Sequence, residues 1–269
     1  MLRPRPATGR RLLEVESHGL ATWNHFEAQR EYRLKRGIDV LLASIGLVLT
    51  APVFAIVAIL IKLEDGGPIF YAQERVGKDF QPFWLRKFRS MIPDAEGKTG
   101  PVWSCENDPR VLRVGRILRQ TALDELPQLI SIFKGDLSFV GPRSHRMFFF
   151  QKFHEELSDY DRRYGVQPGL TGLAQVLGHY DSSARQKLRL DLIYIKNQSA
   201  TLDLKLILAS ILVTILGRWD QRHGRKLAWV ERFLRLGHHV RRSVVANVRV
   251  NPHERLSSPE TRDHDSSDS

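Results

Sequence analysis

Two adjacent carboxylates, Asp124 and Glu125, are the side chains of this sequence best placed to do chemistry. They precede Pro127, which a helix accepts only in its first turn, so we expect Asp124 to be the N-cap of a helix that ends at Gly135. The dipole of that helix would favour an ionised Asp124 and the binding of a nearby phosphate. An ionised carboxylate beside a phosphate ester can act as a nucleophile, while its neighbour shares a divalent metal or handles protons. An ordinary helix cap is the alternative.

Cationic side chains that could bind phosphate oxygens lie on both sides of this pair. Lys87 and Arg89 alternate with an aromatic residue in the extended stretch 80–91 and could project from one face of a strand. From Arg110 to Arg119 arginines recur every three residues, so in a helix they would follow one side and face anionic headgroups or nucleotide phosphates. A solvated surface is the alternative for both groups.

Two turns further along the chain offer backbone donors and one more cation. The first places Arg143 on a tight loop, and the second holds Gly169 and Gly172 around Thr171. Glycines at such positions permit close approach of the backbone to a ligand. A tight connection would also explain either turn.

An uncharged apolar segment, residues 40–61, precedes all of these side chains. As a straight helix it would extend about 33 Å, which is close to the thickness of the hydrocarbon core of a bilayer. Pro52, preceded by Ala51, removes a hydrogen bond near the middle and leaves two arms that are each too short to cross. Basic residues flank both sides, so the positive-inside tendency gives no orientation. We expect a re-entrant helix hairpin over 35–62; a Pro-kinked spanning helix is the alternative.

Composition limits the classes of partner. A chain of 269 residues has room for one catalytic domain with appended arms, and its formal net charge of +11 indicates nucleic acid, anionic lipid or phosphorylated substrates. No nucleic-acid motif is present, so nucleic acid is not expected. The single cysteine, Cys105, excludes an internal disulfide and a multi-cysteine zinc site.

We divide the chain into five parts by charge and hydropathy. These are a basic N-terminal arm (1–34), the membrane helix (35–62), a catalytic domain (63–216), a basic amphipathic extension (217–250) and a disordered tail (251–269). The fold class expected for the catalytic domain is α+β, mostly helical with a small β-hairpin. The extension interleaves arginines with aromatic and aliphatic residues, which suits anionic phospholipid.

Taken in order, several motifs resemble those of the bacterial sugar transferase family, the monotopic polyprenyl-phosphate hexose-1-phosphate transferases. They are KRGIDVLL, IKLEDGGPIFYAQERVG, RKFRSM, NDPR, LDELPQL, KGDLSFVGPR and PGLTGLAQV. The resemblance implies transfer of a sugar-1-phosphate from a UDP-sugar to undecaprenyl phosphate with release of UMP. It places this reaction at the first membrane step of exopolysaccharide, O-antigen or glycoprotein glycan assembly.

The resemblance also implies roles for individual residues. Asp124 would attack the sugar-linked phosphate to form a covalent phosphosugar intermediate, Glu125 would assist, and Mg²⁺ would be held near both. Arg119 corresponds to a family arginine and is expected to bind phosphate. The enzyme would lie in the bacterial inner (cytoplasmic) membrane with its catalytic domain facing the cytoplasm, and a homo-oligomer is left open.

The sequence departs from the family pattern outside the two carboxylates. The departures are Ala51 in place of Ser, Gln167 in place of Arg, Ser144 in place of Pro, and 177–179 in place of Asn-Gly-Arg. They place the nucleotide and sugar contacts in question. The competing hypothesis is therefore a membrane scaffold of the same fold that has lost catalysis and binds anionic lipid or a partner protein.

Overall fold

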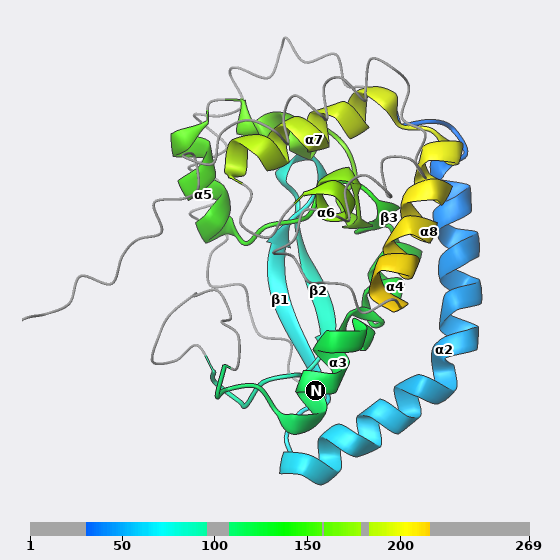
Figure 1. Ribbon diagram of the computed structural model, residues 1–269, viewed down its shortest axis with the longest axis vertical. Coiled ribbons are helices and arrows are strands. Elements are labelled where there is room, and N and C mark those ends of the chain that lie inside the picture. Colours follow the sequence, from blue (N-terminus) through cyan, green and yellow to red (C-terminus); the bar gives the residue numbers. More distant parts are fainter. Residues whose placement is uncertain (1–30, 96–107, 158, 179–182, 216–269) are drawn as a thin grey trace, which may run out of the picture. The chain divides into compact units, whose positions relative to one another are not determined.

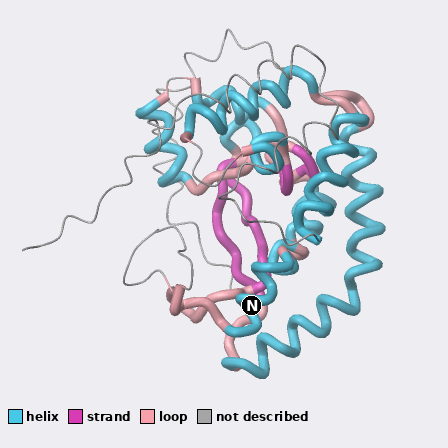
Figure 2. The backbone as a smooth tube through the Cα atoms, in the orientation of Figure 1, coloured by secondary structure: helices cyan, strands magenta, loops and turns pink. Residues whose placement is uncertain are grey.

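The structure, a computed structural model, describes residues 31–95, 108–157, 159–178 and 183–215 (Figure 1). The predicted arm up to residue 30, the amphipathic extension and the tail lie outside the described residues. The described part is mostly helical with two small sheets, as Figure 2 shows, which confirms the α+β prediction.

Helices, short strands and 3₁₀ turns alternate along the described part of the chain. The helices are α2 (Lys35–Asp65), α3 (Arg113–Thr121), α4 (Gln128–Lys134), α5 (Met147–Glu156), α6 (Leu173–Leu177), α7 (Ala184–Asn197) and α8 (Ala200–Ile215). The strands are β1 (Phe70–Val76), β2 (Pro82–Phe88), β3 (Ser138–Val140) and β4 (Gly169–Thr171). The 3₁₀ turns between them are η2 (Lys78–Phe80), η3 (Leu123–Glu125) and η4 (Tyr160–Gly165).

The predicted hairpin is present as the antiparallel pair β1–β2, with Phe70 opposite Phe88 and Val76 opposite Pro82. Phe83 and Leu85 alternate with exposed residues along β2 and pack into one cluster, while Phe88 is buried in another cluster on the opposite face. A second sheet, which the sequence did not predict, pairs β3 and β4 in parallel. It brings the turn that carries Arg143 next to the turn around Thr171, so segments about thirty positions apart share one sheet.

Helix α2 continues through Ala51 and Pro52 as one helix of 31 residues, and Figure 1 shows it as two arms at an angle. Pro52 cannot donate a helix hydrogen bond, which explains a bend at this point. The Thr50 hydroxyl donates to the Gly46 carbonyl at 2.7 Å. At the predicted break the structure therefore has a bend inside a continuous helix.

The two arms of α2 pack on different parts of the domain. Ala43 of the first arm lies in a buried cluster with Leu129 and Ile132 of α4. Val57 and Ile61 of the second arm join a cluster that includes Phe88 of β2 and Leu118 of α3. The bend therefore lets one helix contact both ends of the region that carries the predicted site.

Most of the apolar surface of α2 is not covered by the protein. Its strongly exposed apolar residues are Leu41, Ile45, Val48, Leu49, Ile56, Ile59, Leu60 and Leu63. Within the described part α2 is the one helix long and apolar enough to cross a membrane, and only 11% of its most apolar 18-residue stretch is buried. The core helix of a soluble protein would be mostly buried, so this exposure favours contact with lipid.

Candidate active site

Asp124 lies inside the 3₁₀ turn η3 and is not the N-cap of a helix. Ala122 adopts a positive φ of 56° and ends α3, and the chain turns at once into η3, so the next helix begins only at Gln128 with Pro127 as its N-cap. The N-cap prediction is therefore wrong, while the predicted stop at Gly135, with a φ of 97°, is confirmed.

Apolar neighbours fix the orientation of η3. Leu123 and Leu126 pack against the buried cluster of α2, α3 and β2. The Leu126 N–H donates to the Leu123 carbonyl at 3.2 Å, which closes the turn between these anchors. Asp124 and Glu125 lie between the two leucines, so the turn presents them toward β2 and the loop that carries Arg143.

Lys87 of β2 joins the two carboxylates. Its Nζ lies 2.5 Å from Oε1 of Glu125 and 3.6 Å from Oδ2 of Asp124. Arg143 Nη2 donates to the same Glu125 oxygen at 3.2 Å. Strand alternation places Lys87 on the face of β2 opposite Phe88, and from that face its ammonium group reaches η3.

The two carboxyl groups have different electrostatic surroundings. Burial raises the pKa of Asp124, which is 7% exposed, and the charge of Lys87 partly offsets that rise. For Glu125 burial also acts to raise the pKa, but Lys87 and Arg143 outweigh it and lower the pKa to about 2. The sequence predicted that a helix dipole would favour ionised Asp124. In the structure the charge of Lys87 favours the ionised form, and burial opposes it.

The predicted cations divide into two groups. Lys87 and Arg143 contact the carboxylates, and the charge of Arg119, whose Nε donates to Ser90 Oγ at 3.0 Å, acts on Asp124. Arg89 and Arg110 instead bind structural carboxylates.

Arg89 and Arg110 each hold a nearby segment of the chain. Arg89 is buried and pairs with Asp65 at the end of α2. Arg110 donates through Nε and Nη2 to Asp108 at 2.9 and 2.6 Å. We expected Lys87 and Arg89 to share one phosphate-binding face, but Lys87 lies at the site and Arg89 at the end of α2. Phosphate binding by Arg89 and Arg110 stays a prediction.

Two arginines near the site were not predicted. Burial, followed by the charges of Arg143 and Arg146, lowers the pKa of Arg75 to about 10, so the three guanidinium groups lie within electrostatic reach of one another. Arg75 donates to the Ser144 carbonyl at 3.2 Å. A single arginine in a strand carries no periodic signal, and its position emerges only when β1 and the loop meet.

The glycines around Thr171 serve contact between two segments of the chain. A Cβ on Gly169 would lie 2.0 Å from the backbone nitrogen of Gly141, and one on Gly172 would lie 2.2 Å from the Gly141 carbonyl oxygen. Gly141 also donates to the Thr171 carbonyl at 2.9 Å. These glycines therefore allow the two predicted turns to touch, and ligand binding by Gly169, Thr171 and Gly172 stays a prediction.

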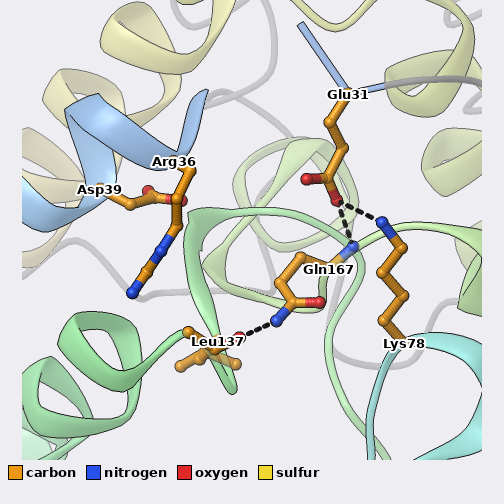
Figure 3. A pocket seen from close by; sticks show the side chains of 7 residues that line it. Glu31, Arg36, Asp39, Lys78, Leu137 and Gln167 are labelled. Atoms are coloured by element: carbon orange, nitrogen blue, oxygen red, sulfur yellow. Dashed lines mark hydrogen bonds and ion pairs between the residues drawn. The ribbon is translucent and has the colours of Figure 1, made fainter. Parts of the chain in front are cut away.

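Gln167 lines a polar pocket of about 250 Å³ at the other end of α4 (Figure 3). Its side-chain amide donates to the Gly135 carbonyl, and its backbone N–H donates to Glu31 at 2.8 Å. Arg36 donates to the Ile132 carbonyl at 2.6 Å beside it. The pocket thus surrounds the C-terminal end of α4, whereas the two carboxylates precede its N-terminal end. The loss of an arginine at position 167 therefore falls away from them.

The carboxylates fit a divalent ion such as Mg²⁺ by the chemistry of their free oxygens. Within the described residues the ion pairs use Oδ2 of Asp124 and Oε1 of Glu125, and the other oxygen of each has no protein partner there. Mg²⁺ binds through one or two carboxylates plus phosphate oxygens and water. No cluster of three or more His, Cys, Asp or Glu occurs within the described ranges, so substrate and water would complete the coordination.

Comparison with known families gives one clear match. The model described as bacterial sugar transferase matches residues 30–217, a segment that includes every helix and strand described above. The two carboxylates, Lys87 and Arg143 all lie within it.

Individual relatives agree with this match. A UDP-N-acetylgalactosamine-undecaprenyl-phosphate N-acetylgalactosaminephosphotransferase of Aeromonas hydrophila is 40% identical over 68% of this chain and 44% of its own length. The exopolysaccharide production protein PSS of Rhizobium leguminosarum bv. phaseoli is 39% identical over 66% of this chain and 93% of its own length. A UDP-glucose:undecaprenyl-phosphate glucose-1-phosphate transferase of Escherichia coli (strain K12) is 38% identical over 66% of this chain and 39% of its own length. The chain thus spans less than half the length of two of these relatives.

Proposed function

Because the chain belongs to the bacterial sugar transferase family, we propose that it transfers a sugar-1-phosphate from a UDP-sugar to undecaprenyl phosphate and releases UMP. The observation that carries this proposal is the pair of carboxylates around one lysine. Asp124 is buried beside Lys87, while Glu125 is held between Lys87 and Arg143. This arrangement provides a nucleophile together with cations for phosphoryl oxygens.

The proposed reaction has two displacements at one phosphorus atom. A carboxylate oxygen of Asp124 attacks the sugar-linked phosphorus, the bond to the bridging diphosphate oxygen breaks, and UMP leaves with that electron pair. An oxygen of the lipid phosphate then attacks the same phosphorus and expels Asp124 as a free carboxylate. Arg143 and Lys87 neutralise the charge on the phosphoryl oxygens during both steps. Bound Mg²⁺ would add neutralisation of the diphosphate.

We also propose that α2 enters one leaflet and returns, with both of its ends on the cytoplasmic side of the inner membrane. Contacts at the two ends support this topology. Near the start, Lys35 pairs with Asp203 of α8 at 2.6 Å. Near the end, Glu64 accepts hydrogen bonds from the backbone N–H groups of Arg113 and Val114 at 2.6 and 2.9 Å. Since both ends bind the domain that carries Asp124, they belong on one side of the bilayer.

The names of the relatives support a role for this reaction in exopolysaccharide synthesis. One is named for exopolysaccharide production, and two are named for N-acetylgalactosamine and glucose transfer. We infer that this chain starts such a glycan on undecaprenyl phosphate. The exposed apolar residues of α2 indicate how it would reach a lipid acceptor whose phosphate lies at the membrane surface.

Release of UMP tests the proposal. The purified full chain, with undecaprenyl phosphate and Mg²⁺, should release UMP from at least one of UDP-N-acetylgalactosamine, UDP-N-acetylglucosamine, UDP-glucose and UDP-galactose, and chelation of the metal should stop it. Asp124→Asn should lower release at least a thousandfold and abolish covalent labelling by donor carrying ³²P in the sugar-linked phosphate, because an amide is a poor nucleophile. Asp94→Asn is the matched control, since Asp94 is exposed with a positive φ that Asn tolerates.

The outcomes separate the enzyme from a scaffold. Normal labelling of Asp124→Asn would remove the nucleophile assignment. A wild-type chain that binds membranes but releases no UMP from any donor would instead favour the scaffold that has lost catalysis.

A further inference from the structure

The loop that carries Arg143 is held by its backbone carbonyls. Four successive carbonyls accept hydrogen bonds from four separate donors: Pro142 from Gly169 N at 2.9 Å, Arg143 from Arg163 Nη2 at 2.9 Å, Ser144 from Arg75 Nη1 at 3.2 Å, and His145 from Val76 N at 2.9 Å. The Arg143 side chain itself remains 49% exposed and reaches Glu125. The protein thus fixes the base of this arginine and leaves its guanidinium at the site.

Arg163 of η4 is the more deeply buried of the two arginines among these donors. Its side chain is 2% exposed, and its Nη2 lies 2.7 Å from Oδ2 of Asp191 on α7, which is 1% exposed. The guanidinium carbon also lies 4.9 Å from the ring centroid of Tyr160. Burying a charge is costly, and Asp191 together with the ring compensates Arg163 for the water it has lost.

The two terminal nitrogens of the Arg163 guanidinium contact different partners. Nη2 faces Asp191 and the Arg143 carbonyl. Nη1 donates to the Tyr160 hydroxyl at 2.5 Å and contacts Nδ1 of His145. Because the guanidinium only donates, His145 Nδ1 must accept, which places the ring proton on Nε2. A lysine could keep the charge but not this fork.

We propose that Arg163, held by Asp191, is a positioning residue that sets the place of Arg143 for phosphoryl transfer. Within the described residues Arg163 makes no hydrogen bond or ion pair with Asp124 or Glu125; it acts on the loop through the carbonyl of Arg143 and the ring of His145. This inference rests on the proposed function, since it gives Arg143 the task of binding phosphoryl oxygens. A shift of about 1 Å in such a group can lower a rate about a hundredfold.

A double-mutant cycle on the full chain tests this mechanism. Arg163→Lys should lower kcat for UMP release about 10- to 100-fold, because one ammonium cannot replace the two-sided fork. In an Arg143→Ala background, which keeps the carbonyl but lacks the guanidinium, the same change should cost less than twofold. Arg162→Lys is the matched control with unchanged activity, since the Arg162 side chain is 44% exposed and lies next to Arg163 in the sequence.

Amide hydrogen exchange gives a readout that does not need activity. Arg163→Lys should speed exchange in a peptide covering 139–147, whereas Arg162→Lys should not. Equal losses of kcat in the presence and absence of the Arg143 side chain, or unchanged exchange, would overturn the proposal. If the wild-type chain releases no UMP, the proposed function fails, and the exchange result still decides whether Arg163 fixes the loop.

Asp191→Asn keeps the test valid if Arg163→Lys does not fold. The amide has the size of the carboxylate and keeps one acceptor oxygen, but it removes the charge that holds Arg163. It should cause a smaller loss of kcat that again disappears in the Arg143→Ala background. A loss that persists there would show that Asp191 and Arg163 act on the fold in general.

Discussion

At the scale of single residues, the position of Lys87 helps to explain why the two neighbouring carboxyl groups differ in pKa. Its Nζ is closer to Glu125 than to Asp124, by 2.5 Å against 3.6 Å. Glu125 therefore remains ionised, with a pKa of about 2, while burial holds the pKa of Asp124 above its ordinary value. Asp124 is thus the carboxylate with the more basic oxygens, which suits a nucleophile.

Lys87→Met should move the pH dependence of UMP release. Ionised Asp124 is required, so activity falls as the pH falls through its raised pKa. Removing the nearby positive charge raises that pKa further, so the acid limb of the profile should shift to higher pH. The maximal rate should also fall. Rate profiles between pH 4 and 9 measure both changes, and Lys134→Met at the exposed end of α4 is the control. An acid limb that stays in place, or moves to lower pH, would contradict the role of Lys87.

At the scale of elements, local signals predicted the hairpin and the helix stop correctly. The predicted hairpin is present as β1–β2, and Gly135 ends α4 because its positive φ suits glycine. The start of α4 was misplaced because Ala122 adopts a positive φ, which few alanines do. The parallel pair β3–β4 was missed because each strand is three residues long and its partner is distant in sequence.

The contact between α2 and α3 predicts a stabilising role for Glu64. Its carboxylate accepts two N–H groups that open α3, so it caps that helix from outside. Glu64→Ala should lower the free energy of unfolding by about 1 kcal/mol. Thermal unfolding in detergent measures the change, with Glu155→Ala on the exposed surface of α5 as control. Equal stability of the two variants would show that the cap contributes nothing.

The bend in α2 predicts the same sidedness for its two ends. In a Cys105→Ser background, Arg33→Cys and Lys62→Cys introduce one exposed thiol at each end of the helix. Because both ends bind the catalytic domain, a membrane-impermeant maleimide should label neither in intact cells and both after permeabilisation. Labelling of only one of them in intact cells would identify a spanning helix.

At the scale of the whole molecule, the main feature is the exposed apolar surface of α2. Val48 and Leu49 are 74% and 72% exposed near the bend. The two arms bury other faces of the same helix in two clusters of the domain. One helix therefore forms part of the core and also presents an apolar surface that suits contact with lipid.

Leu49→Asp should weaken membrane association without unfolding the domain. A carboxylate at this depth costs about 3 kcal/mol in lipid, while the side chain has no place in the protein core. Flotation with vesicles of phosphatidylethanolamine and phosphatidylglycerol measures the bound fraction. Leu34→Asp is the control, because Leu34 is 69% exposed and lies just before α2. An equal bound fraction for both variants would place the bend outside the membrane.

The sequence by itself determined the chemical parts: the Asp124–Glu125 pair, the apolar segment with Pro52, the hairpin and the order of motifs that indicates the family. These depend on residue type and on neighbours a few positions away. Only the tertiary structure decided which cations serve the carboxylates, since Lys87 and Arg143 reach Glu125 from 38 and 18 positions away. It also assigned Arg89 to the end of α2 and Arg163 to the loop, because a charged side chain is directed by the partner that packing brings to it.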